Sequence, residues 1–169
     1  METLTTPAYR MISNHEIAEM RRKLSNGQNA LFTLRSFRRG EIIADFSAGT
    51  IAAEPTYLTI QLGIGKHITF DPEFLQYINH SCDPNVFFDT TAMNLVALKH
   101  LEYGEEMTFF YPSTEWKMVQ PFQCYCKSPH CLGKIRGAAF LSKMEQEKYR
   151  FTDFIQQQLS KRSVRKKVA

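Results

Sequence analysis

The chain has 169 residues and a formal net charge of +4, and 43% of its residues are hydrophobic and 12% aromatic. This composition excludes an intrinsically disordered chain, and the length fits one domain with its own core rather than two of ordinary size. The start of the sequence lacks the apolar stretch of a secretory signal peptide, and no apolar run approaches the roughly 20 residues that a membrane span needs. We therefore expect an intracellular protein, cytoplasmic or nuclear, with no membrane partner.

The positive charge is concentrated at the C-terminus. The segment 161–169, KRSVRKKVA, has five basic residues and no acidic one, so subtracting five from +4 leaves the rest of the chain at −1. A basic tail binds nucleic acid, an anionic surface or an import receptor, or it is only a solvated terminus. We expect any contact with nucleic acid to be weak and confined to this tail.

The sequence pattern predicts a short N-terminal helix followed by many short strands. Ser13 and Glu16 fit a capping box, Ile17 and Met20 follow at helical spacing, and Gly27 is a stop signal. Beyond Gly27, short runs of β-branched and aromatic residues alternate with turn residues, which is typical of strands. The predicted strands are 31–35, 41–46, 57–62, 67–70, 86–88, 95–99 and 107–111.

Two further helical segments and one tight turn are predicted. A helical turn follows 71–73, and the glycines of 63–65 predict a hairpin turn rather than a phosphate-binding loop. Ser142 and Glu145 fit a second capping box and predict a C-terminal helix. The inner face of that helix is expected to carry Phe151, Phe154, Ile155 and Leu159. Short strands without a βαβ rhythm indicate a β-rich α+β fold.

The four cysteines are divided into a group of three and a single one. Cys124, Cys126 and Cys131 form a C-x-C-x4-C cluster, and Cys82 stands alone in NHSCDPN. Four thiolates are a complete ligand set for a tetrahedral structural Zn²⁺, and thiols in a reducing compartment favour metal binding over disulfides. The alternatives are four buried free thiols, or His130 in place of one cysteine.

Three stretches of the sequence resemble the SET-domain lysine methyltransferases that carry a post-SET zinc loop. NHSCDPN at 79–85 resembles the signature of that family, and GEEMTFFY at 104–111 resembles its catalytic strand. CYCKSPHCLG at 124–133 resembles the post-SET loop, whose metal takes its fourth ligand from the cysteine of NHSC. The segment 27–43 resembles the N-terminal motif, with Gln28 and Ala30 where the family has glycine. The resemblance covers roughly residues 27–137.

The resemblance implies a SET fold of several short curled sheets with a threaded, pseudoknot-like C-terminal segment. It divides the chain into an N-terminal helical flank at 1–26, a SET domain at 27–112, a post-SET zinc loop at 113–137, and a C-terminal helix with the basic tail at 138–169. It implies an enzyme that transfers methyl groups from S-adenosylmethionine to a lysine of a histone or of another protein, with Zn²⁺ in a structural role.

The resemblance also implies which residues act in that reaction. Tyr111 corresponds to the catalytic tyrosine, and Phe109 and Phe46 are expected to line an aromatic channel beside it. Phe109 predicts di- or trimethylation, because it leaves room that a tyrosine would fill. The residues expected to contact the cofactor are Gln28, Asn29, Ala30, Leu31, Asn79, His80, Tyr111 and Ile135, and those expected to bind the metal are Cys82, Cys124, Cys126 and Cys131.

Two other functions remain open at this point. Gln28 and Ala30 replace glycines, Phe46 replaces the family's active-site tyrosine, and Phe110 replaces an aspartate; these changes could mark a SET fold that has lost catalysis and kept a peptide groove. A small zinc protein that binds nucleic acid through its tail is the other alternative. Trp116 either packs between the strand and the zinc loop, which we favour, or lines the groove.

Overall fold

The computed structural model describes residues 8–168, in which short strands form five small sheets. Three sheets are antiparallel and three-stranded: β1 (Tyr9–Asn14), β2 (Ala18–Lys23), β3 (Asn29–Thr33); β4 (Ile42–Asp45), β10 (Asn94–Ala97), β9 (Val86–Asp89); and β5 (Ser47–Ala52), β7 (Lys66–Asp71), β6 (Ile60–Gly63), each in order of pairing. The other two are the parallel pair β8 (Asn79–His80) with β11 (Thr108–Phe109) and the antiparallel pair β12 (Phe122–Gln123) with β13 (Lys134–Ile135).

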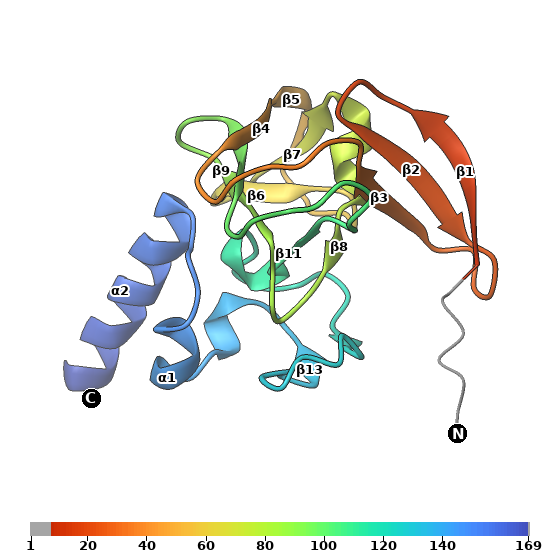
Figure 1. Ribbon diagram of the computed structural model, residues 1–169. Helices are drawn as coiled ribbons and strands as arrows, with labels where there is room; N and C mark the ends of the chain where they lie inside the picture. The colour runs from red at the N-terminus through yellow and green to blue at the C-terminus, as the bar shows by residue number, and fades with distance from the viewer. Residues whose placement is uncertain (1–7, 169) are drawn as a thin grey trace.

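The helical elements are short except for the last one. They are the 3₁₀ helices η1 (Glu73–Tyr77), η2 (Tyr111–Ser113) and η3 (Ala138–Phe140), and the α-helices α1 (Lys143–Gln146) and α2 (Asp153–Val168). Figure 1 shows α1 and α2 together on one side of the molecule, with the β1–β2 hairpin on the opposite side. Within residues 8–168 no helix combines the length and the apolar character that crossing a membrane requires.

The predicted N-terminal helix is wrong, because this segment forms the β1–β2 hairpin. Ala18 and Met20 are buried two positions apart, and the residue between them lies on the other face, which is the period of a strand. Ser13 does not cap a helix; its hydroxyl contacts the His15 ring at 3.0 Å, inside the hairpin turn. The spacing of Ile17 and Met20 fits a helix, but the pairing of β2 with β3 makes this segment a strand.

The predicted strands lie close to the observed ones in the middle of the chain. Those at 31–35, 41–46, 67–70, 86–88 and 95–99 overlap β3, β4, β7, β9 and β10. The inner faces of the three larger sheets meet in one core, whose fully buried side chains include Leu31, Phe37, Ile68, Phe88 and Leu95. The turn predicted at 63–65 joins β6 to β7, with Gly65 at a φ of 58°. Strand 107–111 is shortened to β11 because Tyr111 and Pro112 already begin η2.

The predicted C-terminal helix is divided into two. The capping box is present: Ser142 Oγ accepts a hydrogen bond from Glu145 N at 3.2 Å, and Ser142 N donates to Glu145 Oε2 at 2.6 Å. It starts only the short helix α1, and α2 begins separately at Asp153. Phe151, Ile155 and Leu159 are buried against Phe110, Ala138 and Leu141 as predicted, whereas Phe154 is only partly buried.

Most of the basic tail continues α2, and its Arg162 has a structural contact. The Arg162 guanidinium donates to the carbonyl oxygens of Ala138 at 3.4 Å, Ala139 at 2.5 Å and Leu141 at 2.7 Å. Arg162 therefore caps the C-terminal end of η3 and fastens α2 to the segment after the cysteine loop. The side chains from residue 165 onward lie outside the described part of the chain.

Gly137, between β13 and η3, has a conformation that only glycine adopts readily, with φ 109° and ψ 169°. A Cβ atom there would lie 2.6 Å from the carbonyl oxygen of Trp116, whereas a Cβ at Gly40, with φ 86°, would meet open space. We predict that Gly137→Ala lowers the free energy of unfolding by about 3 kcal/mol and Gly40→Ala by only about 1 kcal/mol. Urea denaturation measures both, and equal losses would contradict this account of Gly137.

Candidate functional site

A cavity of about 880 Å³ lies between the β3, β8 and β11 strands and the loop that follows β11. The lining comes from four parts of the chain in particular, 28–30, 56–60, 75–80 and 118–126. This volume is in the range of pockets that hold cofactors and small ligands. Figure 1 shows that β3, β8 and β11, which bring three distant parts of the sequence to the cavity, lie close together.

Asn79 organises the end of the cavity that the sequence assigns to the cofactor. Its Nδ2 donates to the carbonyl oxygen of Asn29 at 2.8 Å and to Glu106 Oε1 at 3.2 Å, and its Oδ1 accepts from Gln28 Nε2 at 3.1 Å. Gln28, Asn29 and Ala30 all line the cavity. The side chain of Gln28, where the family has glycine, is thus held on Asn79.

Tyr111 lines the cavity beside Asn79 and is held at two points. Its backbone N–H donates to His80 Nδ1 at 3.1 Å, and its hydroxyl donates to the carbonyl oxygen of Ile78 at 3.4 Å. Burial, together with the nearby Glu106 carboxylate, raises the pKa of Tyr111 to about 12. The phenol is therefore neutral at physiological pH and acts as a hydrogen-bonding group rather than as a base.

His80 links Tyr111 to the cysteine cluster. Burial lowers the pKa of His80 to about 4, so its ring is neutral. Because Nδ1 accepts from the Tyr111 backbone, the ring proton lies on Nε2, and Nε2 is 3.4 Å from Cys82 Sγ. One imidazole thus contacts both a cavity residue and a thiol of the cluster.

The structure brings only one of the two predicted channel phenylalanines to the cavity. Phe109 lines it, with its ring centroid 4.7 Å from that of Tyr111. Phe46 instead lies in the core, edge-on to Phe70 and Phe88. Phe70, which the sequence did not single out, lines the cavity in its place.

Phe110 points away from the cavity because side chains alternate along an extended strand. Phe109 and Tyr111 face the cavity, whereas the Phe110 ring stacks on Tyr149 with centroids 3.6 Å apart and planes 8° apart. Tyr149 OH donates to the carbonyl oxygen of Cys82 at 2.9 Å. The segment between α1 and α2 therefore holds the Cys82 turn from the side opposite the cavity.

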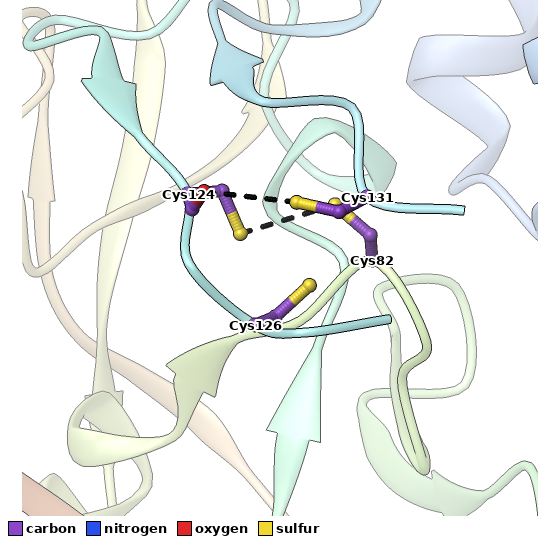
Figure 2. A group of neighbouring side chains, drawn as sticks. All are labelled: Cys82, Cys124, Cys126 and Cys131. Atoms are coloured by element: carbon purple, nitrogen blue, oxygen red, sulfur yellow. Dashed lines mark hydrogen bonds between the residues drawn. The ribbon is translucent and has the colours of Figure 1, made fainter. Parts of the chain in front are cut away.

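The four cysteines lie together, as the sequence predicted. The Sγ atoms of Cys82, Cys124, Cys126 and Cys131 are all within 4.8 Å of one another, and Figure 2 shows the four side chains converging from two segments. Tetrahedral Zn²⁺ with Zn–S bonds of about 2.3 Å requires sulfur atoms about 3.8 Å apart. The donor set and its spacing therefore fit a closed structural zinc site. His130 is exposed and is not part of this group.

The pKa is shifted in opposite directions at different thiols of the cluster. Burial raises the pKa of Cys82 and brings that of Cys124 to about 11. At Cys126 burial also opposes ionisation, but hydrogen bonds from the backbone N–H groups of Cys82 and Ser128 and from neighbouring thiols lower the pKa to about 7. Four thiolates this close need a cation to balance their charge, which a divalent metal supplies.

Two predicted cofactor contacts lie outside the cavity wall. Leu31 is fully buried in the main core, and Ile135 is buried between the cysteine cluster and Phe122. Trp116 packs against the Phe110–Phe151 core and does not line the cavity, as favoured from the sequence, and its backbone N–H donates to Gln61 Oε1 at 3.1 Å.

Sequence reasoning missed two carboxyl groups in the cavity wall, those of Glu106 and Glu115. Glu106 belongs to the GEEMTFFY motif, but strand alternation from Phe109 would place it on the opposite face, so the pattern gave no signal for it. Glu115 gave no signal, because STEWKM reads as an ordinary polar loop. Its burial, with only 7% of its surface exposed, is a property of the folded chain alone.

The chain is similar to several methyltransferases. It is 42% identical over 101 residues to "Methyltransferase flvH" of Aspergillus flavus, covering 59% of this chain and 56% of that protein. It is 31% and 30% identical to the H3 lysine-36 specific histone-lysine N-methyltransferases of Kluyveromyces lactis and Saccharomyces cerevisiae, covering 48% of this chain and 12% of each of those proteins. The chain thus spans just over half of the first relative and a small part of the other two.

The methyltransferase domain of human SETMAR, a solved structure, matches with a TM-score of 0.46 and 15% identity, covering 76% of this chain and 57% of that one. The family model described as "SET domain" matches residues 28–112, which is half of the 169 residues. The chain belongs to the SET domain family.

Proposed function

We propose that this protein is an S-adenosylmethionine-dependent protein-lysine N-methyltransferase. One observation carries the proposal: the neutral phenol of Tyr111 and the ring of Phe109 lie in one cavity with the Asn29–Asn79 network. The cavity therefore offers a polar end for a cofactor and an aromatic position for an amine. The methyltransferase relatives support the same reading.

The polar end fits a positively charged cofactor. Asn79 and the carbonyl oxygen of Asn29 provide hydrogen-bonding groups, and the Glu106 carboxylate supplies negative charge. S-adenosylmethionine, when bound, supplies an electrophilic methyl group on a positively charged sulfonium. Asn79 and Glu106 would hold the cofactor, and they are fixed by hydrogen bonds to each other before it binds.

The aromatic end prepares the lysine. Lysine attacks only as the neutral amine, whereas its unperturbed pKa is about 10.4. Phe70, Phe109 and Tyr111 exclude water from the amine, and this desolvation lowers the pKa of the ammonium. The neutral lysine nitrogen would then accept the methyl group that the bound cofactor supplies, and the proton lost from the methylated nitrogen would leave to solvent.

Tyr111 positions the reacting groups. Its hydroxyl proton is directed at the Ile78 carbonyl, so its lone pairs are free to accept from the amine N–H or from the methyl C–H groups. A fixed acceptor beside a fixed carbonyl holds the amine in line with the methyl group. His80 keeps this arrangement rigid through the Tyr111 backbone.

The cysteine cluster would bind one structural Zn²⁺. Cys124 and Cys126 belong to the loop that forms a wall of the cavity, and Cys82 follows the β8 strand. A metal bound by all four thiolates ties that wall to the strand that carries Asn79 and His80. Its contribution to activity is therefore to close the cavity, and the metal takes no part in methyl transfer.

We propose that the substrate is a lysine-containing protein, a histone or another, in a reducing intracellular compartment. Two of the relatives named above are specific for histone H3 lysine 36. A nucleic acid is a weaker candidate partner, because Arg162 of the basic tail is already bonded to three carbonyl groups. Any contact with nucleic acid would therefore be made by the other basic residues of the tail.

A catalytically inactive peptide-binding module is the second candidate, and Gln28 favours it because its side chain occupies the cofactor end. Two other departures from the family pattern no longer support it. Phe46 lies in the core and Phe110 stacks on Tyr149, so neither side chain touches the cavity. Calorimetry with S-adenosylmethionine separates the candidates, since an inactive module of this kind does not bind the cofactor.

The proposed role of Tyr111 is tested with Tyr111→Phe, which removes only the hydroxyl. We predict a loss of about 100-fold or more in kcat, because the amine is no longer held in line. Labelled S-adenosylmethionine with core histones, free histone tails and a cell lysate measures the transfer. Tyr103→Phe, at a residue with 67% of its surface exposed, is the matched control and keeps full activity. Wild-type turnover in Tyr111→Phe would exclude the proposed mechanism.

The metal is tested with Cys126→Ser and with chelation. We expect about one zinc per chain in the wild type, and loss of both metal and activity in the variant while the β-rich core stays folded. Metal analysis, far-ultraviolet circular dichroism and the transfer assay measure these. His130→Ala is the control, and it keeps the metal because His130 lies outside the cluster. Activity that survives complete zinc removal would refute a role in closing the cavity.

The number of methyl groups is tested at Phe109. The wild type is expected to form di- or trimethyl-lysine, because the phenylalanine leaves room around the amine. Phe109→Tyr adds a hydroxyl that fills this room or holds a water there, so the product shifts to monomethyl-lysine. Mass spectrometry of the product gives the answer. Monomethyl-lysine from both proteins would show that Phe109 does not set the limit.

A further inference from the structure

Glu115 is a buried carboxyl in the cavity wall that the mechanism above does not use. Only 7% of its surface is exposed, and its Oε1 has no hydrogen-bond partner among the described residues. It also forms no ion pair with a described lysine, arginine or histidine. Burial raises the pKa of Glu115 to about 8, against the effect of a hydrogen bond from the Gln61 backbone. Leaving such a group unpaired is costly, and it is typical of functional sites.

The backbone holds Glu115 in a fixed place beside Tyr111. Glu115 N donates to the carbonyl oxygen of Tyr111 at 3.1 Å. Glu115 therefore follows Tyr111 by one helical turn, and the two residues lie on the same face of that turn. The neighbouring residues are tied to β6: Gln61 N donates to the Thr114 carbonyl oxygen at 3.2 Å, and Trp116 N donates to Gln61 Oε1 at 3.1 Å. A group held this firmly can select a ligand.

Glu115 lies beside the reacting end of the cavity rather than in it. The bonds to Gln61 place Glu115 next to the start of β6, and so next to the 56–60 wall. A ligand group that reaches Glu115 is therefore distinct from the amine that reaches Tyr111.

We propose that Glu115 binds a second basic side chain of the substrate, an arginine or a lysine close in sequence to the target lysine. This inference rests on the proposed function, since it names a feature of the peptide that the cavity accepts. A cationic side chain would donate a hydrogen bond to Glu115 Oε1, and its positive charge would favour the ionised carboxylate. A peptide with a neutral residue there leaves the carboxyl buried without a partner, which is how polar sites reject poor substrates.

A purely structural Glu115 makes a different prediction. A protonated glutamic acid that only fills space is replaced by glutamine without any change in peptide preference. A cation-binding Glu115 loses its preference on the same substitution, because glutamine keeps the shape and removes the charge.

The experiment measures peptide binding separately from turnover. Fluorescein-labelled short peptides with a central lysine carry arginine, lysine or glutamine at one flanking position at a time. Anisotropy titrations use the zinc-loaded full chain with S-adenosylhomocysteine, in the wild type, Glu115→Gln, Glu115→Asp and Glu54→Gln. Glu54 is exposed and outside the cavity, so Glu54→Gln is the matched control. Circular dichroism confirms that each variant is folded.

We expect the wild type to bind the best arginine or lysine peptide about tenfold more tightly than its glutamine counterpart. The preference disappears in Glu115→Gln, persists in Glu54→Gln, and weakens in Glu115→Asp, where the carboxyl is withdrawn by one methylene. If Glu115→Gln does not fold, Glu115→Asp alone decides by the same comparison. A preference that survives in Glu115→Gln, an absence of preference, or no peptide binding at all would overturn the inference. Preferential binding without methyl transfer would instead refute the proposed activity and leave the cation site standing.

Discussion

The parallel pairing of β8 with β11 is the contact on which the rest of the site depends. Asn79 pairs with Thr108, and His80 with Phe109, so two residues of the NHSC segment lie directly beside the strand that leads to Tyr111. Asn85 closes the turn from the other side, with Oδ1 accepting from Thr108 N at 2.8 Å and Nδ2 donating to the Glu106 carbonyl oxygen at 2.8 Å. A slip of one residue would exchange the cavity and core faces of both strands.

This pairing couples the cysteine cluster to the cavity through one short segment. Asn79 faces the cavity, Cys82 faces the other three thiols, and His80 between them contacts Tyr111 on one nitrogen and Cys82 on the other. Tyr149 fixes the Cys82 carbonyl from outside. A change in the position of Cys82 would therefore reach Tyr111 through the His80 ring, which is how the proposed metal would influence the proposed activity.

The sequence predicted the cysteine cluster and the Tyr111 strand because short contiguous motifs contain the residues of each. It failed for the β1–β2 hairpin, where the spacing of Ile17 and Met20 suits a helix and the pairing of β2 with β3 overrides that local signal. The sequence placed Phe46 in the cavity wall, where the structure has Phe70 instead, for the same reason. Both are aromatic residues in strands, and which ring reaches the cavity depends on how two sheets meet.

The two carboxyl groups of the cavity would treat the two proposed cations, of the cofactor and of the peptide, differently. Glu106 already accepts a hydrogen bond from Asn79, so a neutral partner holds its carboxyl in place at the cofactor end. Glu115 has no such partner at Oε1, and burial favours its neutral form until a cation arrives. A permanently charged cofactor suits the first environment, and an exchanging peptide suits the second. Because Tyr111 stays neutral, it adds no charge of its own to either carboxyl group.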